Sequence, residues 1–236
     1  MVSTEILALA PMWYVAFLLS LTCHEAAHAL VAKWGGDETA ALGGQVSLNP
    51  VPHIRREPFG TVVVPLLSLV LGGWMIGWAS APYDPVWAER HPKKEALMAA
   101  AGPAANLLLV LVAGLLIRLG MASGTLGPPH RELLGFDHLA MATAPWAEGL
   151  VPLVSILFSL NLILCLFNLM PLPPLDGSAV YPPLFGDDAA RRFKALLRAQ
   201  PALSLLGLVL AWKLFTPVFI PVYGFALALL YAGVGS

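Results

Sequence analysis

The sequence predicts an all-α polytopic membrane protein that forms a single integral-membrane domain over residues 1–236. Of its 236 residues 58% are hydrophobic and only 11% are charged, whereas about a quarter of the residues in a soluble domain are charged. Five apolar stretches are long enough to enter a bilayer, at residues 6–32, 60–80, 96–119, 150–172 and 201–234. The first, third and fourth of these are expected to form a core of three transmembrane helices.

The stretch 60–80 is expected to behave differently because it contains several residues that break helices. These are Gly60, Pro65, Gly72, Gly73 and Gly77. We expect a re-entrant hairpin or two tilted half-helices, which are tolerated in a membrane where protein or a cavity covers them.

The last apolar stretch, 201–234, is too long for one untilted span. Lys213, Pro217 and Pro221 interrupt it. These features favour a C-terminal helical hairpin, with a single broken helix as the alternative.

Basic residues are distributed unevenly among the polar connections. The connections 33–59, 81–95 and 186–200 carry Lys33, Arg55, Arg56, Arg90, Lys93, Lys94, Arg191, Arg192, Lys194 and Arg198. The connection 120–149 carries only Arg131, with Arg118 at its edge. Since cytoplasmic loops are enriched in lysine and arginine, the three basic connections are predicted to be cytoplasmic and 120–149 to lie outside.

A histidine pair lies inside the first apolar stretch, in the sequence His24-Glu25-Ala26-Ala27-His28. Histidines four residues apart share one face of a helix, and Glu25 is placed to act as a base on metal-bound water. Burying these groups in a membrane costs several kcal/mol. The motif therefore predicts an intramembrane zinc centre.

A catalytic zinc usually has three protein ligands and one open position. The best third candidate is Asp176, in the segment Asn168-Leu-Met-Pro-Leu-Pro-Pro-Leu-Asp176-Gly177 that follows the stretch 150–172. Its prolines end the helix, and Gly177 permits a tight turn. The predicted topology brings Asp176 to the membrane depth of the histidines.

These motifs together resemble the site-2 protease family of intramembrane zinc metalloproteases. The HExxH sequence and the segment 168–177 carry the resemblance, and Ala101-Gly102-Pro103-Ala-Ala-Asn106 resembles the family's Gly-Pro-x-x-Asn. The stretch 44–54 resembles the compact prokaryotic branch, which lacks a PDZ domain. The resemblance covers most of residues 6–180, the predicted core of the domain.

The resemblance implies a peptidase that hydrolyses peptide bonds within or near transmembrane segments of membrane proteins, in regulated intramembrane proteolysis. It implies a Zn²⁺ held by His24, His28 and Asp176, with Glu25 as the catalytic base. Asn168 or Asn106 is expected to donate a hydrogen bond to the oxyanion or to support the site.

The expected partners are transmembrane protein substrates and the lipid bilayer. Nucleic acid is not expected, because the formal net charge is −1. The short polar connections suggest a multi-pass protein of a prokaryotic plasma membrane, with the active site towards the cytoplasm. No sequence feature indicates an oligomeric state.

Residues 41–49 alternate enough to predict a short membrane-associated β-strand beside the site. Such a strand could bind an extended substrate by edge pairing.

Two other functions compete with the peptidase. A zinc transporter or sensor could use the same ligands but would not need Glu25, and the inverted repeats common in transporters are not found in the sequence. A catalytically silent family member could act as a membrane scaffold. The variant Glu25→Gln separates these functions, since it should abolish only proteolysis and largely spare zinc binding.

Overall fold

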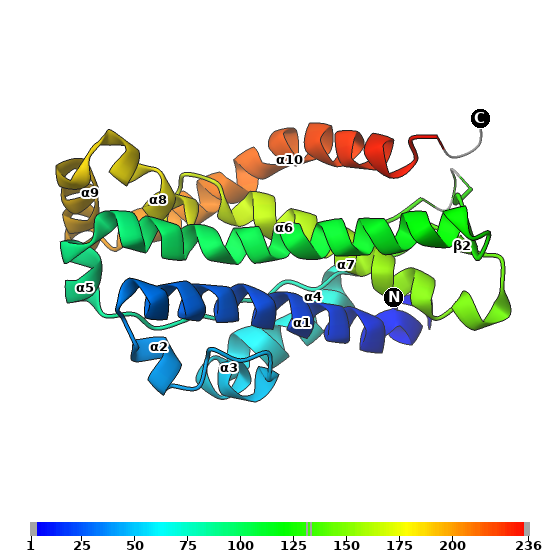
Figure 1. Cartoon of the computed structure of the whole chain (residues 1–236), viewed down its shortest axis with the longest axis horizontal. Helices are drawn as coiled ribbons and strands as arrows, with labels where there is room; N and C mark the ends of the chain where they lie inside the picture. The colour runs from blue at the N-terminus through cyan, green and yellow to red at the C-terminus, as the bar shows by residue number, and fades with distance from the viewer. Residues whose placement is uncertain (1–3, 131, 133, 234–236) are drawn as a thin grey trace.

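The structure, a computed structural model, describes residues 4–130, 132 and 134–233. Three long helices form its core: α1 (Thr4–Gly35), α6 (Pro92–Ala122) and α7 (Leu150–Asn168). A fourth, α10 (Ala202–Leu230), packs on α6 and α7 (Figure 1). All four are long and apolar enough to cross a membrane. The expected all-α polytopic fold with a three-helix core is therefore confirmed.

Short elements connect the long helices. In chain order they are α2 (Thr39–Leu42), α3 (Pro50–Arg56), the π-helical η1 (Phe59–Val63), α4 (Val64–Gly72), α5 (Pro85–Arg90), β1 (Leu126–Gly127), β2 (Met141–Ala142), η3 (Pro145–Ala147), α8 (Gly177–Val180), η4 (Pro182–Phe185) and α9 (Asp187–Ala199). The strands β1 and β2 pair antiparallel, with Leu126 opposite Ala142.

Two apolar clusters hold the long helices together. One joins α1 to α7 and α4 through fully buried side chains such as Phe17, Ile156 and Leu69. The other joins α6, α7 and α10 through Ile117 and Phe158, among others. Both clusters use side chains of α7, which places this helix between α1 and α10.

The stretch 60–80 forms a hairpin with one helical arm and one arm without regular secondary structure. Nine residues of α4 rise about 14 Å, roughly half the thickness of a bilayer core. The returning arm is fixed to the helical arm by Trp78 N–H, which donates to the Gly60 carbonyl over 3.1 Å. Ile76 N–H donates to Ser68 Oγ over 2.8 Å. The chain therefore reverses direction as the predicted hairpin does, although only one arm is helical.

The predicted strand at 41–49 is wrong. Residues 39–42 form α2, and the chain then turns at Gly43 and Gly44 and continues through bends at residues 46–48. Two side chains fix this path, because Gln45 donates to the Ser80 carbonyl and Asn49 Oδ1 accepts from Val51 N–H at the start of α3. The local hydrogen bonds of these side chains replace a ladder of backbone hydrogen bonds.

The predicted C-terminal hairpin is also wrong, because α10 is one helix of 29 residues that contains both Pro217 and Pro221. No turn sequence separates the two halves. The two prolines lie four residues apart and therefore remove hydrogen bonds from one side of the helix, which bends it without reversing it. The change of direction is visible in Figure 1.

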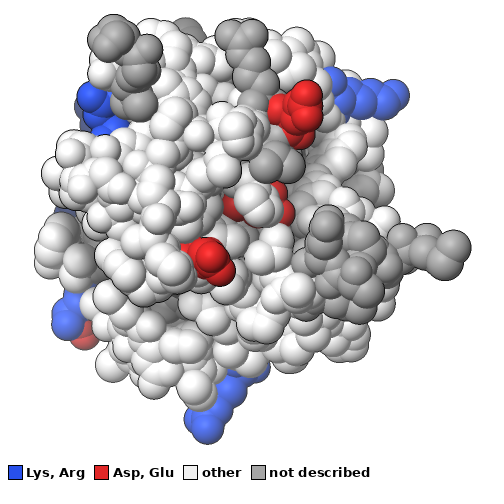
Figure 2. Space-filling view, turned by 90° about the vertical axis from the view of Figure 1, so that its right-hand side faces the viewer, with Lys and Arg blue, Asp and Glu red and all other residues white. Residues whose placement is uncertain are grey.

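The basic residues of α5, of the start of α6 and of α9 lie at one end of the bundle. That end carries α5, α8 and α9 (Figure 1). Figure 2 views the opposite end, where acidic side chains lie near the middle and basic side chains project only at the edge. Arg118 donates to the carbonyls of Leu229 and Leu230 at the end of α10, whereas Arg131 lies outside the described residues. The folded chain thus keeps the charge asymmetry that the predicted orientation requires.

The helix α10 touches the chain segment that follows α7. Ala211 packs with Met170 and Leu175, and Gly207 lies so close that an added Cβ would be 2.1 Å from the Pro173 carbonyl oxygen. This close approach fixes the path of the segment that leads to Asp176.

We expect Gly207→Ala to destabilise the folded protein by about 1–3 kcal/mol, the usual effect of overpacking. The readout is thermal or denaturant unfolding in detergent. Gly224→Ala on the same helix is the matched control, because its Cβ would meet nothing within 4 Å. Equal stability of the two variants would show that α10 does not support this segment.

Candidate metal centre

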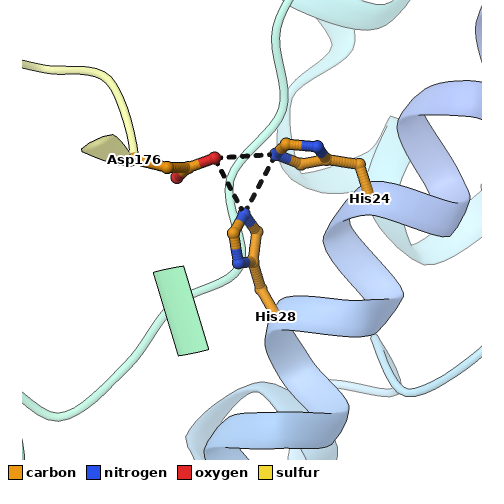
Figure 3. A group of neighbouring side chains, drawn as sticks. All are labelled: His24, His28 and Asp176. Atoms are coloured by element: carbon orange, nitrogen blue, oxygen red, sulfur yellow. Dashed lines mark hydrogen bonds and ion pairs between the residues drawn. The ribbon is translucent and has the colours of Figure 1, made fainter. Parts of the chain in front are cut away.

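The three predicted ligands converge on one point (Figure 3). His24 and His28 project from successive turns of α1, and Asp176 approaches from the segment after α7. The Nε2 atoms of the two histidines are 3.0 Å apart. Asp176 Oδ2 lies 3.2 Å from Nε2 of His24 and 3.4 Å from Nε2 of His28. Both imidazoles are buried.

The other nitrogen of each imidazole has a hydrogen-bond partner that determines its tautomer. Nδ1 of His28 lies 2.7 Å from the Met98 carbonyl oxygen. Nδ1 of His24 lies 2.6 Å from Asn106 Oδ1. Since both partners are acceptors, each Nδ1 carries a hydrogen and donates it. Each neutral ring therefore presents an unprotonated Nε2 to the other ligands.

Nε2 of His24, Nε2 of His28 and Oδ2 of Asp176 are thus three acceptors that face one another inside the bundle. Asp176 Oδ2 has no hydrogen-bond donor among the described residues. Lone pairs at such separations repel unless a cation lies between them. Tetrahedral zinc with bonds of about 2.0–2.1 Å holds its ligand atoms about 3.3 Å apart. The observed separations fit a zinc ion.

Gly102 of α6 provides the space beside these ligands. A Cβ at this position would be 2.4 Å from Nε2 of His28 and 2.6 Å from Nε2 of His24. Any side chain here would displace the imidazoles from their present positions. The glycine of the Gly-Pro-x-x-Asn motif is therefore part of the centre.

The position of Asp176 follows from how α7 ends. After Asn168 the chain makes two tight turns, in which Leu172 N–H donates to the Met170 carbonyl and Leu175 N–H to the Leu172 carbonyl. Asp176 precedes α8 and stands at its N-cap, but its side chain makes no capping hydrogen bond. Its carboxylate is directed to the histidines instead.

Glu25 is 4% exposed, and its Oε2 atom has no hydrogen-bond partner among the described residues. A buried carboxylate oxygen without a partner is unfavourable, and such groups are frequent at functional sites. It adjoins His24 in the sequence and is suited to accept a proton from water in the centre.

The two asparagines proposed as oxyanion donors differ in their surroundings. Asn168 donates through Nδ2 to the Leu164 carbonyl of its own helix, over 3.1 Å. Asn106 donates through Nδ2 to Asn161 Oδ1 over 2.7 Å, while its Oδ1 accepts from His24. This arrangement favours a supporting role for Asn106 over an oxyanion role.

The sequence reasoning missed Asn161 and Ser20, which are both fully buried and contact Asn106 or each other. A signal for Asn161 was present, because a polar amide within the apolar stretch 150–172 needs a hydrogen-bond partner inside the bundle. The pattern did not show that its partner also holds a metal ligand.

Comparisons with known proteins agree with this centre. The model of Peptidase family M50 matches residues 12–212. The "Putative zinc metalloprotease YwhC" of Bacillus subtilis is 38% identical over 172 residues, which are 72% of this chain and 68% of that protein. The "Putative zinc metalloprotease Rip2" of Mycolicibacterium smegmatis is 28% identical over 74% of this chain and 58% of that protein. The protein of the same name in Mycobacterium tuberculosis strain Erdman is 30% identical over 82% of this chain and 64% of that protein.

The chain thus spans less than two thirds of the length of these mycobacterial relatives. No solved structure matches the chain. The family match covers both the histidine motif and Asp176, and the fold brings these side chains close enough together to hold a metal ion. The chain therefore belongs to peptidase family M50, the zinc-dependent site-2 protease family.

Proposed function

We propose that the protein is an intramembrane zinc endopeptidase that cuts membrane-protein substrates within or near their transmembrane segments, in regulated intramembrane proteolysis. The observation that carries this proposal is the convergence of His24, His28 and Asp176 on one point. Next to His24 in the sequence is the buried Glu25, whose Oε2 atom has no hydrogen-bond partner among the described residues, and α1, which carries both histidines, is long enough to span a membrane. A prokaryotic plasma membrane with the site towards the cytoplasm agrees with the position of the basic connections.

Each catalytic group has a defined task in this proposal. Zinc, when bound by His24, His28 and Asp176, supplies an acidified water and polarises the peptide carbonyl. Glu25 accepts the proton of the attacking water and later delivers it to the leaving amine. Asn168 is the candidate donor to the developing oxyanion, once its amide leaves the Leu164 carbonyl.

A substrate helix must unwind locally before its peptide bond can be attacked, because its amides are engaged in helical hydrogen bonds. An apolar groove beside α1 offers room for an extended segment. Its walls are formed by one face of α1 and by residues 46–48 opposite: Cys23, Ala26, Ala27, Leu30, Val46, Ser47 and Leu48. The bends at 46–48 do not form a strand, so substrate pairing there would have to order this segment.

The test is co-expression of the full chain with a panel of tagged single-span membrane proteins. Fragments cut within a span by the wild type, and absent with Asp176→Ala, would establish the proposed activity. Zinc content is measured for both proteins. Intact substrates in the presence of wild-type protein that holds one zinc per chain would support the scaffold or the transporter in place of the peptidase.

A further inference from the structure

A chain of buried amides joins the three core helices next to the metal centre. Asn106 of α6 contacts His24 of α1 on one side and Asn161 of α7 on the other. Asn161 in turn contacts Ser20 of α1, one helical turn before His24. Ser20, Asn106 and Asn161 are all fully buried. In this part of the bundle polar contacts therefore connect α1, α6 and α7 through one network.

The directions of the hydrogen bonds in this network are determined at the end that is most distant from His24, where backbone carbonyls act as acceptors. Asn161 Nδ2 lies 2.8 Å from the Leu157 carbonyl oxygen, which only accepts, so the amide nitrogen must face it. Ser20 Oγ lies 2.6 Å from the Ala16 carbonyl oxygen and donates to it. The oxygen of Ser20 is then free to accept the second hydrogen of Asn161 Nδ2, over 2.8 Å.

With its nitrogen committed in this way, Asn161 presents Oδ1 to Asn106. This oxygen accepts from Asn106 Nδ2 over 2.7 Å, and the Ser20 carbonyl lies 3.4 Å from the same nitrogen. Asn106 must consequently turn its own Oδ1 to His24, 2.6 Å away. Only an imidazole with a hydrogen on Nδ1 fits this acceptor, and that tautomer leaves Nε2 free for the metal.

We propose that Asn161, supported by Ser20, is a positioning residue that sets the tautomer of His24 through Asn106. The proposal rests on the proposed zinc centre and adds a residue of α7 that touches none of its ligands. A rotated Asn106 amide would offer donors to Nδ1 and favour the tautomer that cannot bind through Nε2. Asn161 prevents this rotation because its Oδ1 would then face Asn106 Oδ1.

The first experiment measures zinc affinity by chelator competition on the detergent-purified full chain, together with thermal unfolding. Asn161→Leu is expected to weaken zinc binding about 10–100-fold, the range for residues that orient a ligand. Ser20→Ala removes the hydroxyl that accepts from Asn161 but leaves Asn161 bonded to the Leu157 carbonyl, and it is expected to weaken zinc binding about three- to tenfold. Ser159→Ala is the matched control, since Ser159 is also fully buried in α7 but contacts Tyr223 instead.

A rescue separates orientation of His24 from a merely structural role. Asn106→Asp offers acceptors only, so it can hold the Nδ1 hydrogen of His24 without help, but its carboxylate repels Asn161 Oδ1. Alone it is expected to weaken zinc binding. In the double variant Asn106→Asp, Asn161→Leu the repulsion is absent, because leucine has no oxygen at this place. The double variant is therefore expected to bind zinc at least tenfold more tightly than Asn161→Leu alone. Cobalt spectra of the same variants report whether the ligand geometry returns.

The outcomes discriminate between this inference and the proposed function. Unchanged zinc affinity in Asn161→Leu overturns the inference. The inference is also overturned if the loss of zinc affinity in the double variant equals the sum of the losses, as free energies, in the two single variants. In both cases the wild type still holds zinc, and the proposed peptidase stands. A wild type that binds no zinc overturns both.

Discussion

Glu25→Gln is expected to lower substrate cleavage about 10²–10⁴-fold, the usual contribution of a general base, while the chain keeps one zinc. The glutamine has nearly the shape of the glutamate but cannot accept the proton of the attacking water. The ligands His24, His28 and Asp176 remain in place, so the metal is retained. The measurements are cleavage of a tagged substrate and zinc content of the same preparation.

Glu89→Gln is the control for this variant, because it removes a carboxylate that pairs with Arg198 in an exposed position away from the centre. It should cleave like the wild type. Cleavage by Glu25→Gln at the wild-type rate would remove Glu25 from the mechanism. Loss of zinc from Glu25→Gln would mean that the carboxylate holds the metal site together and would leave the base unassigned.

Gly102→Ala is expected to remove zinc binding altogether, beyond the about 100-fold loss that changes to supporting residues cause. The added methyl group would lie within 2.6 Å of Nε2 of both histidines and must push the imidazoles apart. Alanine is more favourable than glycine inside a helix by about 0.5–1 kcal/mol, so α6 itself should remain folded. Zinc affinity and helix content by circular dichroism are the two readouts.

Gly114→Ala, on the same helix, is the matched control for Gly102→Ala. Its Cβ would be 3.2 Å from the Phe158 ring, which small side-chain movements can relieve. We expect it to bind zinc like the wild type. If Gly102→Ala also retains wild-type affinity, the space beside the histidines is not needed by the metal.

The sequence was sufficient to predict that His24 and His28 lie together, because their spacing is a local property of one helix. His24 and His28 share a face through the helical period alone. Asp176 required more, since only the charge of the connections and the resemblance of 168–177 placed it near the histidines. The three-helix core could also be predicted from the sequence, because a helix that crosses a bilayer must be long and apolar.

The features that could not be predicted depend on contacts between distant segments. Residues 41–49 alternate as a strand would, but Gln45 hydrogen-bonds to Ser80 and no second strand lies beside them in the described chain. Pro217 and Pro221 are strong breakers in water, yet a span surrounded by lipid has no better partner for its backbone than its own helix. The role of Asn161 depends on Asn106 and Ser20, which lie on two other helices.

The division of the metal centre between α1 and the segment after α7 has a consequence for biosynthesis. A chain still under synthesis contains the histidine pair and Glu25 from the first helix onwards, but it lacks Asp176 until α7 has been completed. The centre can therefore be assembled only after the third core helix has been synthesised, since Asp176 follows α7 in the chain. Incomplete chains therefore cannot form the three-ligand centre.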